Sequence, residues 1–391
     1  MTQRESLEDD PWLLIEPDPG SLSQLCSRMG VKGVQVEPIP NLNRDFIRDL
    51  RPIYGITLLL RHKPEKSYRD EMFTNNNNVY FANQVVHDAY AMYAILSILL
   101  NREETIDIGS ELLNFKEFTS DFPPMLKGLS VTNSKILKDA HNGVARRSAR
   151  QSAHGDNTYH YISYLPIGGH LWELDGFKRG PLRLGKSGEL KKKSLPCTEN
   201  SWLDAARAEL QRKLDIYQRQ QIPFSVWSII EDRRHVYQRR LVKKAYLKSA
   251  IERQLDYCDP NWRLTFRAHQ WEDEYKHALE TERCKRGAAM HIYFPYCRSI
   301  EDLSVQDRAE LDSEIENNMI NRPVQELVDL WLQNQDDSIR IYERLGEEQE
   351  KHESYENVTI RRQHDYTPFI RTFISRLVAR GHLQRMMADI S

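Results

Sequence analysis

The chain lacks the features of secreted and membrane-spanning proteins. It has only five cysteines in 391 residues, an odd number at scattered positions, which argues against a disulfide framework and for a reducing compartment. Its polar, acidic first ten residues do not form a signal peptide. The longest apolar run, from Ala89 to Leu100, is too short to cross a bilayer and is typical of a buried helix. These absences predict a protein of the cytoplasm, the nucleus or both, with no membrane partner.

The chain also lacks a charge excess of either sign. A formal net charge of −2 argues against strong bulk attraction to nucleic acid, and no nucleic-acid partner is expected. What the chain does have is 40% apolar residues, enough for at least one substantial core. Its length suggests two or three domains.

The sequence pattern changes near residue 232. Before that point, strand-like runs such as "GITLLL" and "HYISYLPI" lie among helical patterns and Gly/Pro turns, which predicts an α/β or α+β domain over residues 11–232. Beyond it the pattern is helical and heavily charged. We expect a charged helical linker over residues 233–334 and a helical C-terminal domain over residues 335–391. The Lys and Arg excess after residue 232 is interpreted as a solvated helix face, with nucleic-acid contact as the alternative.

Three polar residues of the first part have the chemistry of a cysteine-protease site. Such a site needs a histidine base, a carboxylate that orients it, and a donor that holds the developing oxyanion. His160 lies in the strand-like "YHYISY", Asp175 ends "LWELDG", and Gln84 precedes the apolar helix. Each also has a structural interpretation when taken alone: a half-buried strand histidine, a turn former and a helix-start residue.

Taken together, these residues and their surroundings resemble the ubiquitin carboxyl-terminal hydrolase family of papain-like thiol deubiquitinases. The resemblance begins at "LIEPDPG" and continues through "YGITLLLR", "FANQVVHDAYAMYAILSILLN", "KGLSVTNS" and "HYISYLPIGGHLWELDG". It resumes at "IRRQHDYTPFIRTFISRL", which is similar to the helical C-terminal extension of the proteasome-associated member, an extension shared by the nuclear Polycomb deubiquitinase. Residues 258–325 match least. The resemblance implies a papain-like hydrolase domain followed by an α-helical extension.

The resemblance places Gln84 at the oxyanion position, His160 at the base position and Asp175 at the orienting position. The nucleophile position falls on Tyr90, where the family has cysteine. A phenol has an ordinary pKa of about 10 against about 8.5 for a thiol, so far less of it is ionised near neutral pH. Its ring is expected to push toward His160 or to occupy the channel for the ubiquitin tail. Tyr90 is therefore interpreted as a core aromatic in a retired active site.

Two functional hypotheses remain open. In the first, the protein is a ubiquitin-binding or regulatory pseudoenzyme. In the second, it is an active thiol-dependent deubiquitinase that works through an unexpected nucleophile. The substitution at Tyr90 favours the first. The retained Gln84, His160 and Asp175 are either survivors of lost catalysis or structural residues. No cofactor is expected.

The C-terminal block contains an apolar stripe at close to helical spacing: Phe369, Ile370, Phe373, Ile374 and Leu377. We expect this stripe to pack internally against the helix at "IRIYERL", with a groove for a partner helix as the alternative. The family's Lys-rich tail, which docks on a proteasomal ubiquitin receptor, is missing after "GHLQRMMADIS". The expected partners are therefore ubiquitin and a helical adaptor bound through residues 335–391, either a proteasome receptor or a chromatin-complex subunit, with weak binding to proteasomes.

Two weaker features complete the sequence analysis. Cys284, His291 and Cys297 lack the paired short spacing of a zinc site, so no metal is expected. The segment from residue 141 to 159 matches the family's crossover loop, and its arginines at 146, 147 and 150 make it locally basic. We interpret it as a solvated loop, with an acidic partner as the alternative.

Overall fold

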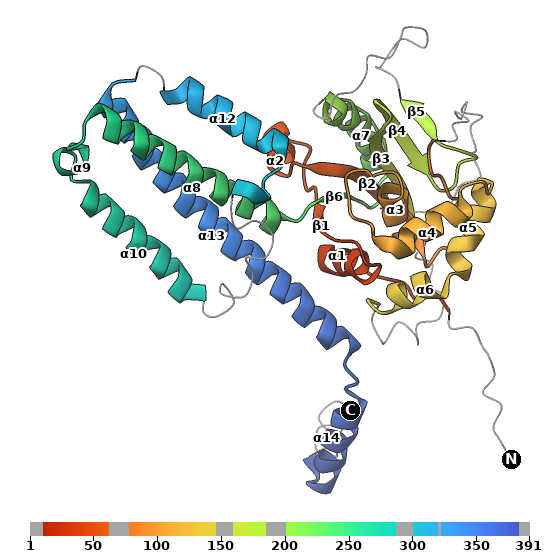
Figure 1. The fold of residues 1–391 in the computed structure, drawn as a ribbon. Helices are drawn as coiled ribbons and strands as arrows, with labels where there is room; N and C mark the ends of the chain where they lie inside the picture. Colours follow the sequence, from red (N-terminus) through yellow and green to blue (C-terminus); the bar gives the residue numbers. More distant parts are fainter. Residues whose placement is uncertain are drawn as a thin grey trace, which may run out of the picture.

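The computed structural model describes residues 11–61, 78–145, 159–184, 201–286, 300–319 and 322–382. A sheet-containing domain lies beside a bundle of long helices (Figure 1). The strands are β1 (Val34–Pro38), β2 (Ile53–Arg61), β3 (Tyr159–Ile167), β4 (His170–Asp175), β5 (Leu182–Leu184) and β6 (Phe224–Glu231). The helices of the domain are α1 (Pro19–Arg28), α2 (Arg44–Asp49), α3 (Tyr90–Leu99), α4 (Gly109–Thr119), α5 (Pro124–Asn133), α6 (Lys135–Asn142) and α7 (Ser201–Arg219).

The six strands form one sheet in the order β1-β6-β2-β3-β4-β5, with antiparallel neighbours throughout. Because side chains alternate along a strand, the sheet contributes to two separate apolar layers, one on each face. In β3, Tyr161 and Leu165 join the core shared with α1 and α3, whereas Ile162 and Tyr164 join the core shared with α2 and α7. The mixed α/β fold of the first part is thus confirmed.

Helix α3 lies in the middle of the first layer. All ten of its residues are buried, because the sequence is apolar on every side of the helix. Its first residue, Tyr90, has no side-chain cap in front of it, since Ala89 occupies the N-cap position. The candidate nucleophile position is therefore fixed by a helix that the core surrounds.

The rest of the chain is helical. Its elements are α8 (Arg233–Cys258), α9 (Trp262–Thr265), α10 (Ala268–Arg286), the 3-10 turn η2 (Ile300–Asp302), α12 (Val305–Met319), α13 (Val324–Gln363) and α14 (Thr367–Ala379). Helices α8 and α13 pack along each other, and with α10 and α12 they enclose a core built around Trp262 and Trp331. The segment expected to be a linker is thus a packed bundle. The boundary expected between residues 334 and 335 falls inside the continuous helix α13.

Helix α13 extends beyond this bundle and packs on α1 (Figure 1). Arg362 donates to Asp18 at 2.6 Å, and Lys351 pairs with Glu37 of β1. The ring of Tyr355 lies so close to Gly20 that an added Cβ would be 2.7 Å from its Cδ1, so only glycine fits there. The C-terminal helices are therefore anchored to the sheet domain by specific contacts. Among the described residues, no helix combines the length and apolar character that crossing a membrane requires.

Candidate functional site

Tyr90 is buried at the start of α3, with only 1% of its surface exposed. Its hydroxyl donates a hydrogen bond of 2.7 Å to the carbonyl oxygen of Ile15, and its ring lies 4.8 Å from the ring of Tyr159. Burial first, and then the neighbouring Tyr159, Asp18 and Glu16, raise the pKa of the hydroxyl well above its ordinary value. The hydroxyl is therefore a neutral donor held by the N-terminal segment. The expected push toward His160 is not what fixes this ring.

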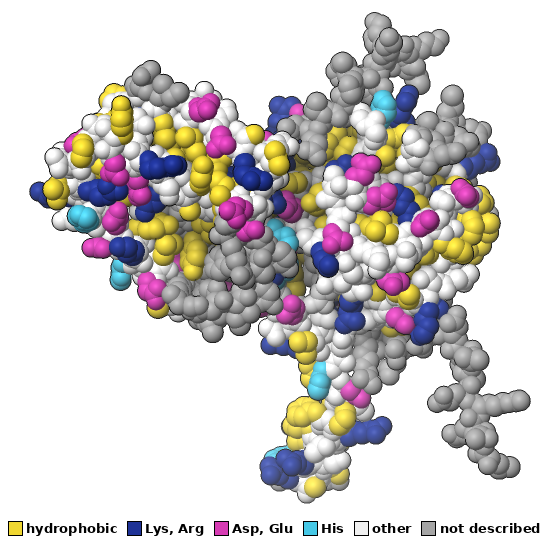
Figure 2. All heavy atoms as spheres, in the orientation of Figure 1, with side chains coloured by type: hydrophobic (Ala, Val, Ile, Leu, Met, Phe, Trp, Pro, Cys, Tyr) yellow, Lys and Arg dark blue, Asp and Glu magenta, His cyan; other side chains and the backbone are white. Residues whose placement is uncertain are grey.

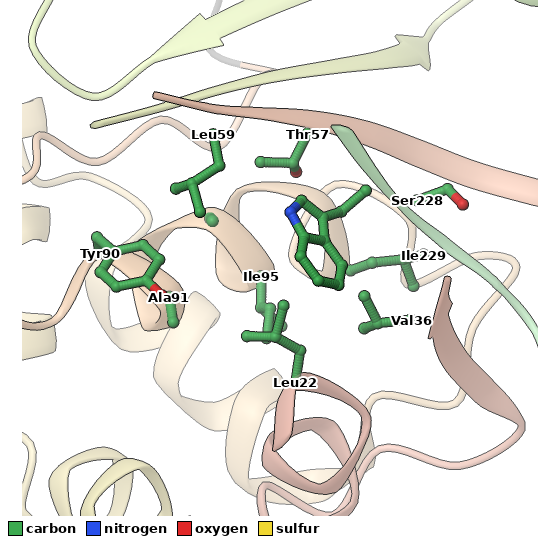
Figure 3. Close-up of a pocket in the computed structure, with 11 residues that line it drawn as sticks. Leu22, Val36, Thr57, Leu59, Tyr90, Ala91, Ile95, Ser228 and Ile229 are labelled. Carbon is green, nitrogen blue, oxygen red and sulfur yellow. The ribbon is translucent and has the colours of Figure 1, made fainter. Parts of the chain in front are cut away.

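A small apolar cavity of about 30 Å³ adjoins Tyr90 (Figure 3). Tyr90 lies at one end of it, and Val36 and Ile229 lie at the other. The polar lining residues are Thr57 and Ser228 of the sheet and the buried Tyr90 itself. This cavity lies between α1, α3 and the sheet, and its lining contains no cysteine.

His160 lies near the start of β3 and Asp175 is the last residue of β4, and the two side chains form a buried pair. His160 Nε2 lies 3.1 Å from Asp175 Oδ1, and the two side chains are 10% and 9% exposed. Burial alone would raise the pKa of Asp175, but the hydrogen bonds and charge of His160, with the amide of Phe177, hold that pKa below its ordinary value. The carboxylate is thus ionised and can orient the imidazole, as the sequence analysis expects.

Phe177 is a residue of the site that the sequence analysis missed. Its ring is stacked on the imidazole of His160, with centroids 4.5 Å apart and planes inclined by 14°. Its amide donates to Asp175 Oδ1 at 3.0 Å. The only signal in the sequence was its position directly after the "LDG" turn, which does not reveal the stacking.

Gln84 lies in the loop before α3 and is 6% exposed. Its backbone amide donates to the carbonyl oxygen of Gly176 at 2.9 Å, and its side-chain Nε2 donates to the carbonyl oxygen of Tyr159 at 3.1 Å. The loop is held further by Asn83, also missed from the sequence, whose Nδ2 donates to Gly176 and Lys178. The bond to Tyr159 thus engages the amide nitrogen that an oxyanion donor would use.

The structure therefore brings Gln84, His160 and Asp175 together. Gln84 donates hydrogen bonds to the carbonyl oxygen of Tyr159, which precedes His160, and to that of Gly176, which follows Asp175. Tyr90 lies beside the group, against Tyr159, but its hydroxyl bonds elsewhere. The arrangement can orient an imidazole, and the described residues that form it include no thiol.

The described cysteines do not lie among these residues. Cys26 is fully buried in α1, and burial raises the pKa of its thiol to about 12, so it is protonated and inert. Cys258 and Cys284 belong to the helical bundle. Cys197 and Cys297 lie outside the described residues, as do His291 and the basic loop positions 146, 147 and 150. No cluster of three or more potential metal ligands occurs in the described part of the chain.

The apolar stripe of α14 is exposed, so the prediction that it packs internally is wrong. Phe369, Ile370, Phe373 and Ile374 are 66%, 49%, 52% and 45% exposed, and no residue of α14 is buried. Figure 2 shows these hydrophobic side chains on the helix that projects from the lower end of the molecule. The reason is geometric, because α14 follows α13 after α13 has passed α1, and Figure 1 shows no other described helix or strand beside it there.

Comparisons with known proteins agree with this architecture. The model of the family "Ubiquitin carboxyl-terminal hydrolase, family 1" matches residues 12–214, more than half of the chain, and a second model, "Ubiquitin carboxyl-terminal hydrolases", matches residues 339–383. The ubiquitin carboxyl-terminal hydrolase isozyme L5 of Dictyostelium discoideum is 30% identical over 385 residues, which cover 97% of this chain and 95% of that protein. The ubiquitin carboxyl-terminal hydrolase calypso of Aedes aegypti is 30% identical over 97% of this chain and 87% of its own length.

Solved structures also match. A crystal structure of Trichinella spiralis UCH37 bound to ubiquitin vinyl methyl ester is 30% identical, with a TM-score of 0.47. The match covers 60% of this chain and 88% of that one.

Proposed function

Because this chain belongs to the ubiquitin carboxyl-terminal hydrolase family, we propose that it binds ubiquitin through its hydrolase-like domain without cleaving ubiquitin conjugates. The observation that carries the proposal is Tyr90, which stands at the nucleophile position with its hydroxyl neutral, buried and donated to Ile15. The family relationship supports ubiquitin as the ligand, and the site supports binding without turnover.

The lost chemistry is large compared with anything the remaining residues supply. Removing the nucleophile of a catalytic triad costs roughly a millionfold in turnover. The pair of His160 and Asp175 could take a proton from a thiol, but the phenol of Tyr90 has its proton engaged by a carbonyl oxygen 75 residues away. Catalysis by an active thiol deubiquitinase, the alternative function, would need an unexpected nucleophile, and none of the described cysteines lies beside His160 and Asp175.

The test combines binding with turnover. Ubiquitin is titrated against the purified full chain, and release of a fluorogenic leaving group from the ubiquitin C-terminus is followed in parallel. We expect binding without release, and no labelling by ubiquitin carrying a thiol-reactive group. Release that disappears in Gln84→Ala and His160→Ala proteins would refute the proposal, whereas release that persists in both would reveal a contaminating hydrolase.

The exposed stripe of α14 supports a second part of the function, the binding of a helical adaptor. Arg371 and Arg376 lie on the same helix, Arg380 is its C-cap, and no acidic residue occurs between residues 367 and 382. An amphipathic helix with an apolar face and an acidic border would satisfy both the stripe and these charges. A proteasome receptor and a chromatin-complex subunit are the two candidates, in the cytoplasm or the nucleus.

This part is tested with a double substitution, Phe369→Ser with Phe373→Ser. Both rings are exposed, so we expect the stability of the isolated chain to change by less than about 0.5 kcal/mol while adaptor co-purification is lost. Phe118→Ser is the matched control, because Phe118 is 70% exposed on α4. An adaptor that is retained by the double variant would contradict adaptor binding through the stripe.

A further inference from the structure

The basic side chains of α8 differ in whether a carboxylate accompanies them. Most of them form an ion pair, namely Arg234, Arg239, Lys243, Lys244 and Lys248. Arg233 and Arg240 form none with any described residue. Exposure to water does not account for this, because Arg233 is only 4% exposed. A charged side chain buried to that degree is almost always paired, so Arg233 lacks the usual companion.

Arg233, Tyr237 and Arg240 share one face of α8, because positions four and seven residues apart align along a helix. The centroid of the Tyr237 ring lies 5.0 Å from the guanidinium carbon of Arg233 and 5.7 Å from that of Arg240. Arg233 donates to the carbonyl oxygen of Arg51 at 2.9 Å and to the hydroxyl of Tyr237 at 3.5 Å, both uncharged acceptors. Two like charges are therefore held around one ring, where α8 joins the sheet domain.

A third arginine, Arg344 of α13, lies within electrostatic range of this face. Helix α13 packs along α8. Partial burial first, and then the charge of Arg233, lowers the pKa of Arg240, and the charge of Arg344 lowers it further. Tyr237 and Asp49, the last residue of α2, act in the opposite direction. Arg344 is itself exposed and forms no ion pair within the described ranges.

The charges around Tyr237 do not balance. Three arginines and one aspartate leave an excess of two positive charges. The face of the ring attracts cations, but it has no net charge and does not neutralise them. A planar guanidinium group binds phosphate through paired N–H donors, and a phosphate group carries close to two negative charges near neutral pH. A single phosphate group therefore has both the charge and the acceptors that this face lacks.

We propose that Arg233, Arg240 and Arg344 bind the phosphate group of a small soluble molecule. A compact group is favoured because Arg233 is buried at the base of the face, whereas the exposed Arg240 and Arg344 approach from two helices. The bound phosphate connects α8 with α13 beside their joint with the sheet domain. The proposal does not depend on ubiquitin binding.

The experiment uses inorganic phosphate as the probe and the full chain as the protein. Calorimetry at pH 8, where phosphate is largely doubly charged, gives the dissociation constant. The thermal midpoint is recorded in phosphate and in sodium chloride of the same ionic strength. We expect a dissociation constant of about 1 mM or lower, and a higher midpoint in phosphate than in chloride, because a ligand that binds only the folded state stabilises it.

Two variants locate the phosphate. Arg240→Gln and Arg344→Gln each remove one exposed guanidinium group, and each should weaken binding about tenfold or more, the loss expected for a charge-assisted hydrogen bond. In phosphate-free buffer neither should lower the thermal midpoint, because removing one of several like charges relieves repulsion. Arg253→Gln is the matched control. Arg253 is an exposed arginine of the same helix, about 20 Å along it from Arg240, and bonds only a backbone carbonyl oxygen among the described residues, so this variant should bind as the wild type does.

The wild-type chain alone can overturn the proposal. Equal midpoints in phosphate and chloride, or binding weaker than about 1 mM, would do so without any variant. Phosphate binding that both site variants retain in full would also overturn it, since the phosphate would then lie elsewhere. A midpoint that both variants lower in phosphate-free buffer would show that the arginines serve the fold and not a ligand, and it would overturn the proposal as well.

Discussion

Replacing Tyr90 by cysteine tests whether the other parts of the catalytic site are still usable. The new thiol would stand at the first residue of α3, where the helix N-terminus lowers a thiol pKa. His160 and Asp175 are already paired, and Tyr159, the chain neighbour of His160, packs on Tyr90, so Tyr90→Cys should restore some labelling by ubiquitin that carries a thiol-reactive group.

The substitution also has a structural cost. It deletes a fully buried ring next to an existing cavity of about 30 Å³, and it removes the hydrogen bond that the carbonyl oxygen of Ile15 accepts. Truncation of a buried aromatic side chain costs about 3–5 kcal/mol. Since a domain has about 5–15 kcal/mol of stability, the variant should fold with a clearly lower thermal midpoint. Tyr90→Phe, which keeps the ring and loses one buried hydrogen bond, should cost only about 1–2 kcal/mol.

The expected rescue is partial for two reasons. His87, Asp88, Met92 and Tyr93 depart from the family pattern around the nucleophile, and the amide nitrogen of Gln84 is bonded to a carbonyl oxygen. Labelling is measured by mass spectrometry on protein whose folding has been checked by circular dichroism. Its dependence on the imidazole is checked with His160→Ala in the Tyr90→Cys background. If a well-folded Tyr90→Cys protein shows no labelling at all, the base or the ubiquitin groove has also been lost.

Two further predictions concern the contact between α13 and the sheet domain. Burial first, and then the charge of Arg234, lowers the pKa of His352 to about 4, so the fold favours its neutral form. Its contribution to stability is therefore complete above the unfolded pKa of about 6.5 and is lost as the pH falls toward 4, with about 2 kcal/mol lost by pH 5. Denaturant titrations should show a shallower pH dependence for His352→Gln, and an unchanged one would contradict this assignment. Arg362→Ala removes the ion pair with Asp18 and should increase hydrogen exchange in the second half of α13. Arg361→Ala, at an exposed neighbouring position, should leave the exchange unchanged. Equal exchange in the two variants would mean that the ion pair does not hold the helix.

The sequence predicted the family, the mixed fold of the first part and the residues that meet at the site. These depend on local patterns: alternation in β3, the apolar series of α3 and the spacing of His160 and Asp175. The bond from Tyr90 to Ile15 joins residues 75 positions apart, and it could not be predicted because any carbonyl oxygen of the core can accept from a phenol. The fate of the α14 stripe was undetermined for a related reason. An apolar helix face has the same pattern whether its own chain or a partner covers it.

The retained side chains of the site do two different things, and the difference bears on why they are there. Gln84 joins the loop before α3 to β3 and to the end of β4, and Asp175 holds both Phe177 and His160. These bonds stabilise the fold without any catalysis and would explain retention of the residues as structure. Gln84 Oε1 and His160 Nδ1 have no hydrogen-bond partner among the described residues, but the same holds for His141 Nδ1 and Tyr164 OH, which lie away from the site. What sets the site apart is therefore the pairing of His160 with Asp175 and the bonds that Gln84 makes to both strands, and these bonds serve the fold whether or not a ligand is bound.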